Sequence, residues 1–346
     1  MTTIFPTRLW TYSIVIAFGI TTRLSAAVLP ESMSEAMKQA AAYLKREAEV
    51  WPDENGCYSC HNNGDAARVL FGQDDFSSLL QGERWKTMLN WYLQPEKWLS
   101  AKTDELSLSP ALYTIQFGKA LLSAETSGLL APTQQQRDEV GRLVADHQNE
   151  QGYWPIEPSG TVGSPGTYGN TLGTAFALDI LSACSDATFE SNIGRANQWL
   201  FSQIPSATVD IAGTLLALKH STNPTKRPIQ SRLTEQLIQR QSQSGGWGPY
   251  QNRWPEVFDT SIAMIALAEL SPNPESPLET PLVEGVKFLL DIQDELGAWP
   301  ETTRPTGGTS YAQHISTTAW ALQALQAAAR STGALTHSHQ PLDNSK

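Results

Sequence analysis

The chain is poor in cysteine and in charge, and no cluster of basic residues runs through it. Only 3 of its 346 residues are Cys, and 17% are charged. Three cysteines are too few for a disulfide-based scaffold. A net charge of −11 without a Lys/Arg cluster argues against nucleic acid as a partner. The 40% of hydrophobic residues, with 11 Trp, can fill a large core, so we expect a globular protein.

The N-terminus lacks an apolar run long enough to be a typical membrane span. Residues 1–27 have Arg8, then an apolar stretch from Leu9 to Ile20, then the small residues Ser25-Ala26-Ala27. About a dozen apolar residues fall short of the roughly 20 that span a bilayer, and the pattern is typical of a secretory signal peptide. We therefore expect a secreted or periplasmic protein. The alternative is an uncleaved N-terminal membrane anchor, and peripheral contact with a membrane stays open.

What the chain does contain is an internal repeat. A pattern of Gln, three residues, Gly, one residue and Trp occurs at 148–154, 241–247 and 293–299. The first two copies begin 93 positions apart and the last two begin 52 positions apart. A degenerate copy lies at 197–201, between the first and the second. A repeat of this size indicates stacked supersecondary units that bury their faces only against their neighbours.

Each unit reads as two helices joined by a loop rich in Gly and Pro. The second helices, such as 260–270 and 317–329, are apolar or small at nearly every position and should be buried on all sides. The first helices, such as 284–291, carry charge on one face and should lie outside. Two weaker units precede the clear ones. We therefore predict an all-α fold, a single α/α toroid of about six helix pairs over residues 32–330, and a disordered tail over 331–346.

The Gln-x-x-x-Gly-x-Trp segments resemble the QW repeats of squalene–hopene cyclases, and the helix-pair layout resembles protein prenyltransferase β subunits. The resemblance covers roughly residues 35–330. It implies an apolar, isoprenoid-like ligand that the chain binds or transforms. It also implies a structural role, linking adjacent repeats, for the Gln and Trp of each copy: Gln148, Trp154, Gln241, Trp247, Gln293 and Trp299.

The acidic motifs of these families are missing from the sequence. Neither the Asp-x-Asp-Asp motif of cyclases that protonate their substrate nor the Asp-Asp-x-x-Asp motif that binds diphosphate through Mg²⁺ is present. We therefore expect no class II terpene cyclase activity, and whether the chain is an enzyme stays open.

An alignment of the buried helices by their Ala-Leu endings places Asn170, Asp210, Asp259 and His314 at one common rim, with Ser59 at the same level. In a toroid such a rim faces the central cavity, where ligands bind. Asn170 and Asp210 are good helix caps, and capping is the simplest interpretation of both. Asp259 and His314 are the candidate catalytic residues.

The pentapeptide from Cys57 to His61 has the Cys-x-x-Cys-His spacing that attaches c-type haem. In such a site Cys57 and Cys60 bind the haem vinyl groups, His61 ligates the iron, and His314 is a candidate second metal ligand. The leading hypothesis is therefore an exported toroid with one haem c at the cavity rim and an electron-transfer partner. Alternatives are a zinc site that combines Asp259 with one Cys and one His, a thiol or disulfide pair, and a plain interaction scaffold.

Overall fold

The computed structural model describes most of the chain. It covers residues 25–72, 80–98, 110–156, 169–184, 187–221, 223–271, 278–302 and 309–331. Residues 1–24 of the expected signal peptide and 332–346 of the expected tail lie outside these ranges. Ser25 to Ala27, assigned to the signal, are instead the first residues of a long helix, and Ser331, assigned to the tail, ends the last one.

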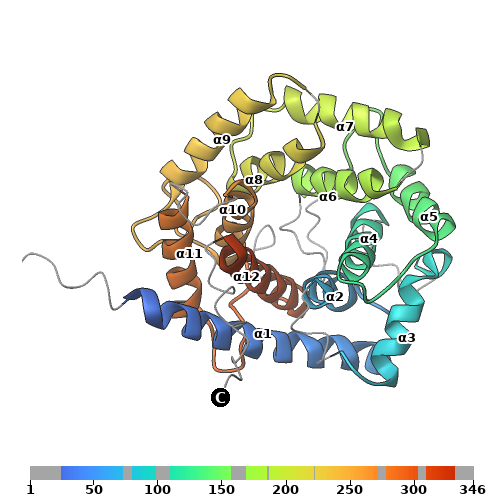
Figure 1. Ribbon diagram of the computed structural model, residues 1–346, viewed down its shortest axis with the longest axis horizontal. Helices are drawn as coiled ribbons and strands as arrows, with labels where there is room; N and C mark the ends of the chain where they lie inside the picture. Colours follow the sequence, from blue (N-terminus) through green and yellow to red (C-terminus); the bar gives the residue numbers. More distant parts are fainter. Residues whose placement is uncertain are drawn as a thin grey trace, which may run out of the picture.

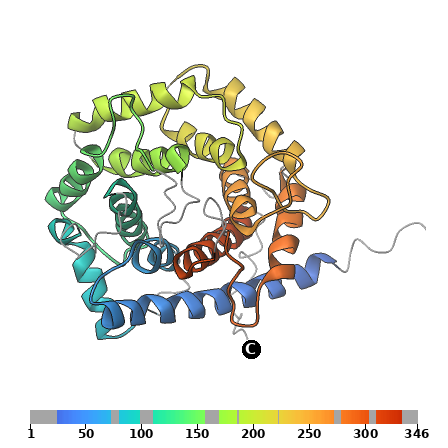
Figure 2. The ribbon, with the colours of Figure 1, turned by 180° about the vertical axis from the view of Figure 1, so that it is seen from behind.

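Two concentric rings of helices make up the described chain, and Figures 1 and 2 show them from opposite sides. The outer ring consists of α1 (Ser25–Asn55), α3 (Glu83–Tyr92), α5 (Gln134–Ala145), α7 (Glu190–Ser202), α9 (Lys226–Arg240) and α11 (Glu279–Ile292). The inner ring consists of the π-helix η1 (Cys60–Ala66) continued by α2 (Ala67–Phe71), and of α4 (Pro110–Thr126), α6 (Gly169–Ala183), α8 (Thr208–Ala217), α10 (Val257–Leu270) and α12 (Tyr311–Ser331). The described residues also include three short 3₁₀ helices between the longer ones: η3 (Pro95–Lys97), η4 (Ala187–Phe189) and η5 (Leu218–His220).

The predicted all-α toroid of six helix pairs is confirmed for the part of the chain that the structure describes. The inner helices are apolar all round because they touch neighbours on every side. In α10 every residue from Val257 to Leu267 is buried, whereas the outer helix α9 buries only Leu233 and Leu237. Each inner helix packs against the next, and α12 packs against η1, so the inner ring is closed.

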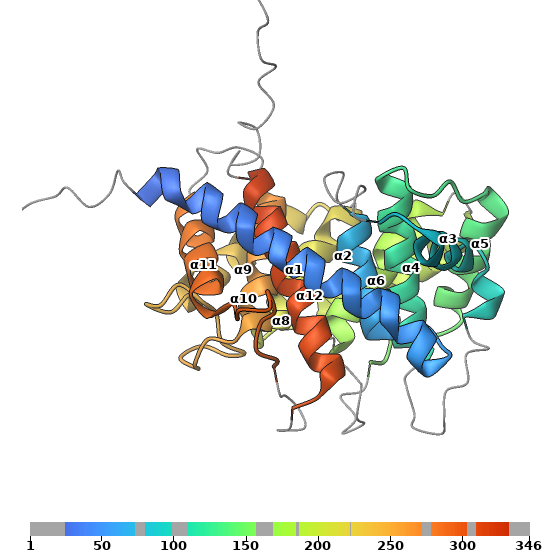
Figure 3. The same ribbon diagram turned by 90° about the horizontal axis from the view of Figure 1, so that it is seen from below.

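The inner helices run parallel, so the ring has two different ends. At one end, the start of η1 meets the start of α12, where the Asn62 side-chain amide donates to the Tyr311 hydroxyl at 2.8 Å. At the other, the Ser331 hydroxyl donates to the carbonyl of Ser271 at 3.1 Å. We call these the N-terminal rim and the C-terminal mouth. Figure 3 shows α1 crossing the side of α2 and α12.

The three QW copies make the same set of hydrogen bonds. In each, the Trp ring N–H donates to a carbonyl ten residues earlier, and the Gln amide donates both to its own motif Gly and to a carbonyl near the start of another outer helix. The Trp bonds are Trp154 to Val144 (2.6 Å), Trp247 to Leu237 (2.7 Å) and Trp299 to Leu289 (2.8 Å). The bonds to the other helices are Gln148 to Asn192 (2.9 Å), Gln241 to Pro281 (2.9 Å) and Gln293 to Ala36 (3.0 Å). The predicted link between adjacent repeats is confirmed for the Gln residues, whereas each Trp ring N–H bonds within its own repeat.

The third copy closes the outer ring. Gln293 follows α11, and its partner Ala36 lies 257 residues earlier in α1. Gly297 of the same copy has φ of +85°, and a Cβ on it would lie 2.5 Å from the Gln39 backbone carbon of α1. Only Gly allows this approach without strain, because it tolerates a left-handed backbone and has no Cβ.

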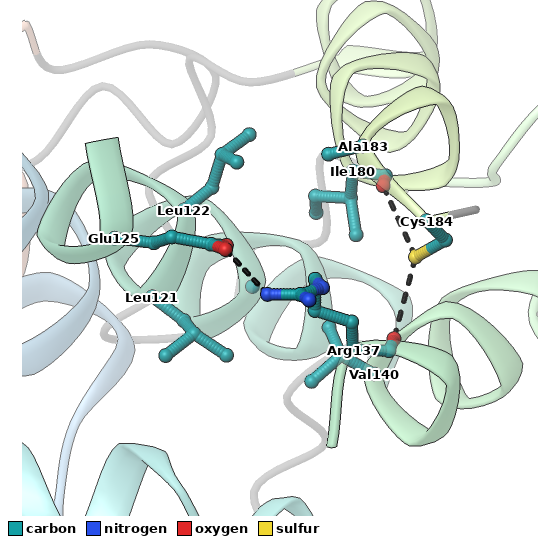
Figure 4. A pocket seen from close by; sticks show the side chains of 9 residues that line it. Leu121, Leu122, Glu125, Arg137, Val140, Ile180, Ala183 and Cys184 are labelled. Atoms are coloured by element: carbon teal, nitrogen blue, oxygen red, sulfur yellow. Dashed lines mark hydrogen bonds and ion pairs between the residues drawn. The ribbon is translucent and has the colours of Figure 1, made fainter. Parts of the chain in front are cut away.

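A small cavity between α4, α5 and α6 is lined in part by the third cysteine (Figure 4). The Cys184 Sγ lies 3.3 Å from the carbonyl oxygens of Arg137 and Ile180, and Arg137 pairs with Glu125 at 2.6 Å. The cavity beside them measures about 20 Å³, room for about one water molecule. Cys184 is therefore a packing residue.

No helix among the described residues is both long and apolar enough to cross a membrane.

We expect Gly297→Ala to lower the free energy of unfolding by more than Gly56→Ala does. Gly56 also has a positive φ (+67°), but a Cβ there meets nothing within 4 Å. Both substitutions carry the cost of a left-handed backbone, about 1–2 kcal/mol, and only Gly297→Ala adds the clash with α1, a further ~1–3 kcal/mol. Urea unfolding of the two variants measures the difference. Equal losses would show that the close approach to α1 is unimportant.

Candidate functional site

The Cys-x-x-Cys-His motif lies at the N-terminal rim, as predicted from the repeat alignment. Cys57 is half-buried in the loop after α1, and Cys60 and His61 are buried at the start of η1. No disulfide joins the described cysteines. The Cys60 Sγ lies 4.0 Å from Nδ1 of His61. The thiols and the imidazole are therefore neighbours on the closed inner ring.

His61 is turned towards the outer helix α1. Its ring packs edge-on against Trp51 of α1 (centroids 4.8 Å apart) and against Tyr311 of α12 (5.6 Å). Trp51 and Tyr311 are stacked on each other at 5.5 Å. Burial lowers the pKa of His61 to about 3, so the ring is neutral near pH 7. Its Nε2 is buried and has no hydrogen-bond partner among the described residues.

Burial raises the pKa of Cys60, whereas it lowers that of His61. Loss of solvation, followed by the nearby charge of Asp65, raises the pKa of the Cys60 thiol to about 12. Since the thiolate is the reactive form of cysteine, this shift keeps Cys60 in its thiol form at neutral pH while it is buried in this way.

Asn62 and Asn63, the two residues after the motif, hold it against α1. Pro52 lies in the last turns of α1 and has no backbone N–H, so the Ala48 carbonyl four residues earlier loses its usual helical partner. The Asn63 side-chain amide donates to this carbonyl at 3.2 Å. Asn62 donates in the same way to the carbonyl of Glu47 at 3.1 Å. The inner ring is thus fastened to α1 by two asparagines.

The loss of stability caused by Asn63→Ala should depend on Pro52. In the natural chain the variant leaves the Ala48 carbonyl buried without a partner, at a cost of about 1–3 kcal/mol. In a Pro52→Ala background a backbone N–H returns to that carbonyl, so the loss should shrink by about 1 kcal/mol. A double-mutant cycle measured by urea unfolding tests this.

Asn62→Ala is the matched control, because Pro52 does not free the Glu47 carbonyl. Its cost should be the same in both backgrounds. An Asn63→Ala loss that is also independent of Pro52 would contradict the explanation.

The other predicted rim residues lie in the first turns of their helices but serve different purposes. The Asn170 side chain accepts from the Ile156 backbone N–H at 2.8 Å, so it holds the loop before α6 rather than capping its own helix. Asp210 is the third residue of α8, whose N-cap is Ala207, so the predicted N-cap role is wrong; its carboxylate reaches back to the Ala207 backbone, and burial raises its pKa. Asp259 is fully buried in the first turn of α10.

His314 is half-buried in the first turn of α12 and also faces α1. Its Nδ1 lies 3.3 Å from a carboxylate oxygen of Glu301, and its ring packs edge-on against Tyr43 at 5.9 Å. Tyr43 and Trp51 are eight residues apart on one face of α1, so His314 and His61 contact α1 at separate places. Within the described ranges no three His, Cys, Asp or Glu side chains gather into a group that could hold a metal ion.

A buried ion pair that sequence analysis missed lies deeper in the inner ring. Asp65 and Arg68 are 0% and 2% exposed, and their charged atoms are 3.5 Å apart. The Gln116 amide donates to Asp65 at 2.9 Å, and the Arg68 guanidinium also donates to Gln323. Burial raises the pKa of Asp65, and Arg68 opposes that rise. The available signal was two charges three residues apart within an apolar inner helix.

Arg68 also rests on an aromatic cluster. Its guanidinium carbon lies 4.4 Å from the ring centroid of Trp320 and 5.4 Å from that of Phe176. Trp320 stacks on Phe176 at 5.5 Å and meets Phe258 edge-on at 5.6 Å. Phe176 belongs to α6 and Trp320 to α12, which lie on opposite sides of the inner ring (Figure 1). The stack therefore spans the lumen, and we call these three rings the aromatic floor.

A second charged group surrounds Asp179 towards the C-terminal mouth. Lys119 pairs with Asp179 and lies 4.7 Å from the centroid of Phe176. Lys219 and His220 reach the other Asp179 oxygen at 2.9 and 2.6 Å. Burial alone would raise the pKa of Asp179, but Lys119 and the hydrogen bond from His220 hold it below its usual range.

The sequence pattern of the squalene-hopene cyclase C-terminal domain matches residues 202–339 of this chain. That segment holds the last helix pairs and two of the three QW copies. No relative among curated proteins matches the sequence.

Solved structures show the same toroid. The type II terpene cyclase MstE from Scytonema, as a variant in complex with the substrate geranylgeranyl dihydroxybenzoate, is 12% identical, with a TM-score of 0.57 over 88% of this chain and 99% of that one. A second MstE variant, in complex with the product merosterolic acid A, is 11% identical, with a TM-score of 0.59 over 88% and 99%. A protein from Actinoplanes is 15% identical, with a TM-score of 0.59 over 86% and 99%. The chain therefore has the fold of terpene cyclase toroids.

Proposed function

We propose that the toroid binds an apolar, isoprenoid-like ligand on the N-terminal side of its lumen. The observation that carries the proposal is the aromatic floor, in which three inner helices bring Phe176, Phe258 and Trp320 together across the ring. Aromatic side chains offer large apolar surfaces and are typical of ligand pockets. The similar fold of MstE in complex with a geranylgeranyl substrate supports this choice of ligand class.

The chemistry of the site favours binding over cyclisation that starts with protonation. At the start of α10, Glu256-Val257-Phe258-Asp259 has carboxylates only at the first and fourth positions of the Asp-x-Asp-Asp motif, and its third position is Phe258. Arg68 and Lys119 lie against the floor, and each is paired with a carboxylate, Asp65 and Asp179 respectively, so neither carboxylate is a free proton donor there. We therefore propose a binding protein rather than a class II cyclase.

Export and membrane contact form part of this proposal. The signal-like residues 1–27 support a secreted or periplasmic location. Ile204 and Trp254, in loops before α8 and α10, are 89% and 90% exposed at the N-terminal rim. The two loops are joined by a bond from the Thr208 backbone N–H to the Pro249 carbonyl at 2.9 Å. Peripheral contact of this rim with a membrane would give an apolar ligand a short path to the lumen.

Farnesol is a suitable probe, and its binding should raise the melting temperature in proportion to its affinity. Phe258→Leu should weaken farnesol binding about 3- to 10-fold, because an aromatic contact contributes about 0.5–1.5 kcal/mol. Phe189→Leu is the control, since Phe189 is equally buried but packs between α5 and α6, away from the floor. Absence of farnesol binding, or equal weakening by both variants, would remove the proposal.

A second candidate is the c-type haem protein indicated by the Cys57–His61 motif. It is favoured by the free Nε2 of His61, a neutral imidazole nitrogen of the kind that ligates iron, and by two thiols outside any disulfide. When bound, the haem would supply one-electron chemistry, and an electron-transfer partner would follow. Trp51 and Tyr311 pack on the His61 ring, so this function requires them to move aside.

The intact mass of the protein, exported from a host that attaches c-type haem, distinguishes the candidates. A haem protein gains one haem mass, which Cys57→Ala and Cys60→Ala should abolish and Cys184→Ala should retain. A mass lower by two hydrogens indicates a disulfide, and stoichiometric zinc by metal analysis indicates the zinc site. An unmodified natural chain would exclude covalent haem.

A further inference from the structure

A cavity of about 480 Å³ opens at the C-terminal mouth, at the opposite end of the inner ring from the Cys-x-x-Cys-His motif. The ends of α2, α4 and α12 and Glu269 of α10 surround it. Its size suits a small organic molecule. The aromatic floor lies between this cavity and the N-terminal rim, because Arg68 and Lys119 both line the cavity and both rest on floor rings.

The cavity is basic although the chain is acidic. Arg68, Lys119 and Arg330 line it, against the single carboxylate of Glu269. Asp65 neutralises Arg68, and Asp179 pairs with both Lys119 and Lys219. Counting these groups, four cations face three carboxylates, so one positive charge is uncompensated before any charge on His220 is added.

Two hydrogen-bond donors at the cavity are unused. The side-chain amide nitrogen of Gln326 and the Nε of Arg68 are both buried without a partner among the described residues. Both residues are 2% exposed and both line the cavity. An amide NH₂ and a guanidinium N–H can only donate, so the group that would satisfy them is an acceptor.

We propose that this cavity binds a small organic anion through a carboxylate or phosphate group. The uncompensated charge attracts it, and Gln326 and Arg68 supply donors that a planar or tetrahedral oxyanion accepts once their side chains turn towards the cavity, because both donor atoms are closed off from solvent in this conformation. Basic residues at this end of the ring are explained in general by the helix C-termini, because positive side chains complement the negative ends of α2, α4 and α12. This does not explain two buried donors that no helix carbonyl accepts. The anion site is independent of the apolar ligand, because the aromatic floor separates the two.

Inorganic phosphate and farnesyl monophosphate are the probes, with farnesol as the uncharged reference, all at constant ionic strength because salt screens such sites. We expect phosphate to bind saturably, as measured by calorimetry or by a rise in melting temperature. Arg330→Gln and Gln326→Met should each weaken phosphate binding about tenfold, the effect of one lost charge-assisted hydrogen bond. Gln326→Met keeps the side-chain size, Arg330→Gln removes the charge, and both spare the Asp65–Arg68 and Lys119–Asp179 pairs.

Arg84→Gln is the matched control, since Arg84 pairs with Asp53 on the exposed face of α3 and should not alter phosphate binding. If Arg330→Gln weakens the binding of farnesyl monophosphate only, the anion is the head group of an amphiphile. If it weakens the binding of inorganic phosphate equally, the ligand is a free anion. If the phosphate compounds bind and farnesol does not, only the apolar-ligand proposal is refuted. The anion site is overturned if neither phosphate compound binds, or if Arg330→Gln and Gln326→Met behave like Arg84→Gln.

Discussion

The attachment of α1 to both rings is the constraint on which the rest of the toroid depends. Gln293 bonds to the Ala36 carbonyl and closes the outer ring, while Asn62 and Asn63 bond to carbonyls about three turns further along α1. Stacked repeats otherwise leave an open face at each end. Here one long helix, α1, covers both open faces, because its early turns contact α11 and its later turns contact the start of the inner ring.

The same attachment accounts for the environment of the Cys-x-x-Cys-His motif. Pro52 removes a donor from α1, Asn63 replaces it, and His61 is thereby drawn against Trp51. The low pKa of His61 and the high pKa of Cys60 are both consequences of this burial. A motif that would be solvated on an exposed loop is therefore neutral and shielded in this structure.

Much of the fold could be predicted from the sequence, since a repeat of helix, Gly-Trp loop and helix can bury its apolar faces only in a closed stack. The alignment of Ala-Leu endings also brought the start of η1 to the level of α12. It could not predict which way each side chain faces. His314 turns to Glu301 and α1, and Asn170 bonds to a loop. The spacing of Asp65 and Arg68 was visible, but the residues that hold this buried pair, Gln116 of α4 and Gln323 of α12, are far away in sequence.

The contact between Gln293 and Ala36 has a consequence for the order of assembly. Synthesis delivers α1 well before α11, so α1 has no outer neighbour on that side until some 257 residues later. Contacts of such long range form slowly and leave apolar surface exposed meanwhile. During that interval the apolar face of α1 is uncovered on that side, so a chaperone that binds amphipathic helices could protect it until α11 is made.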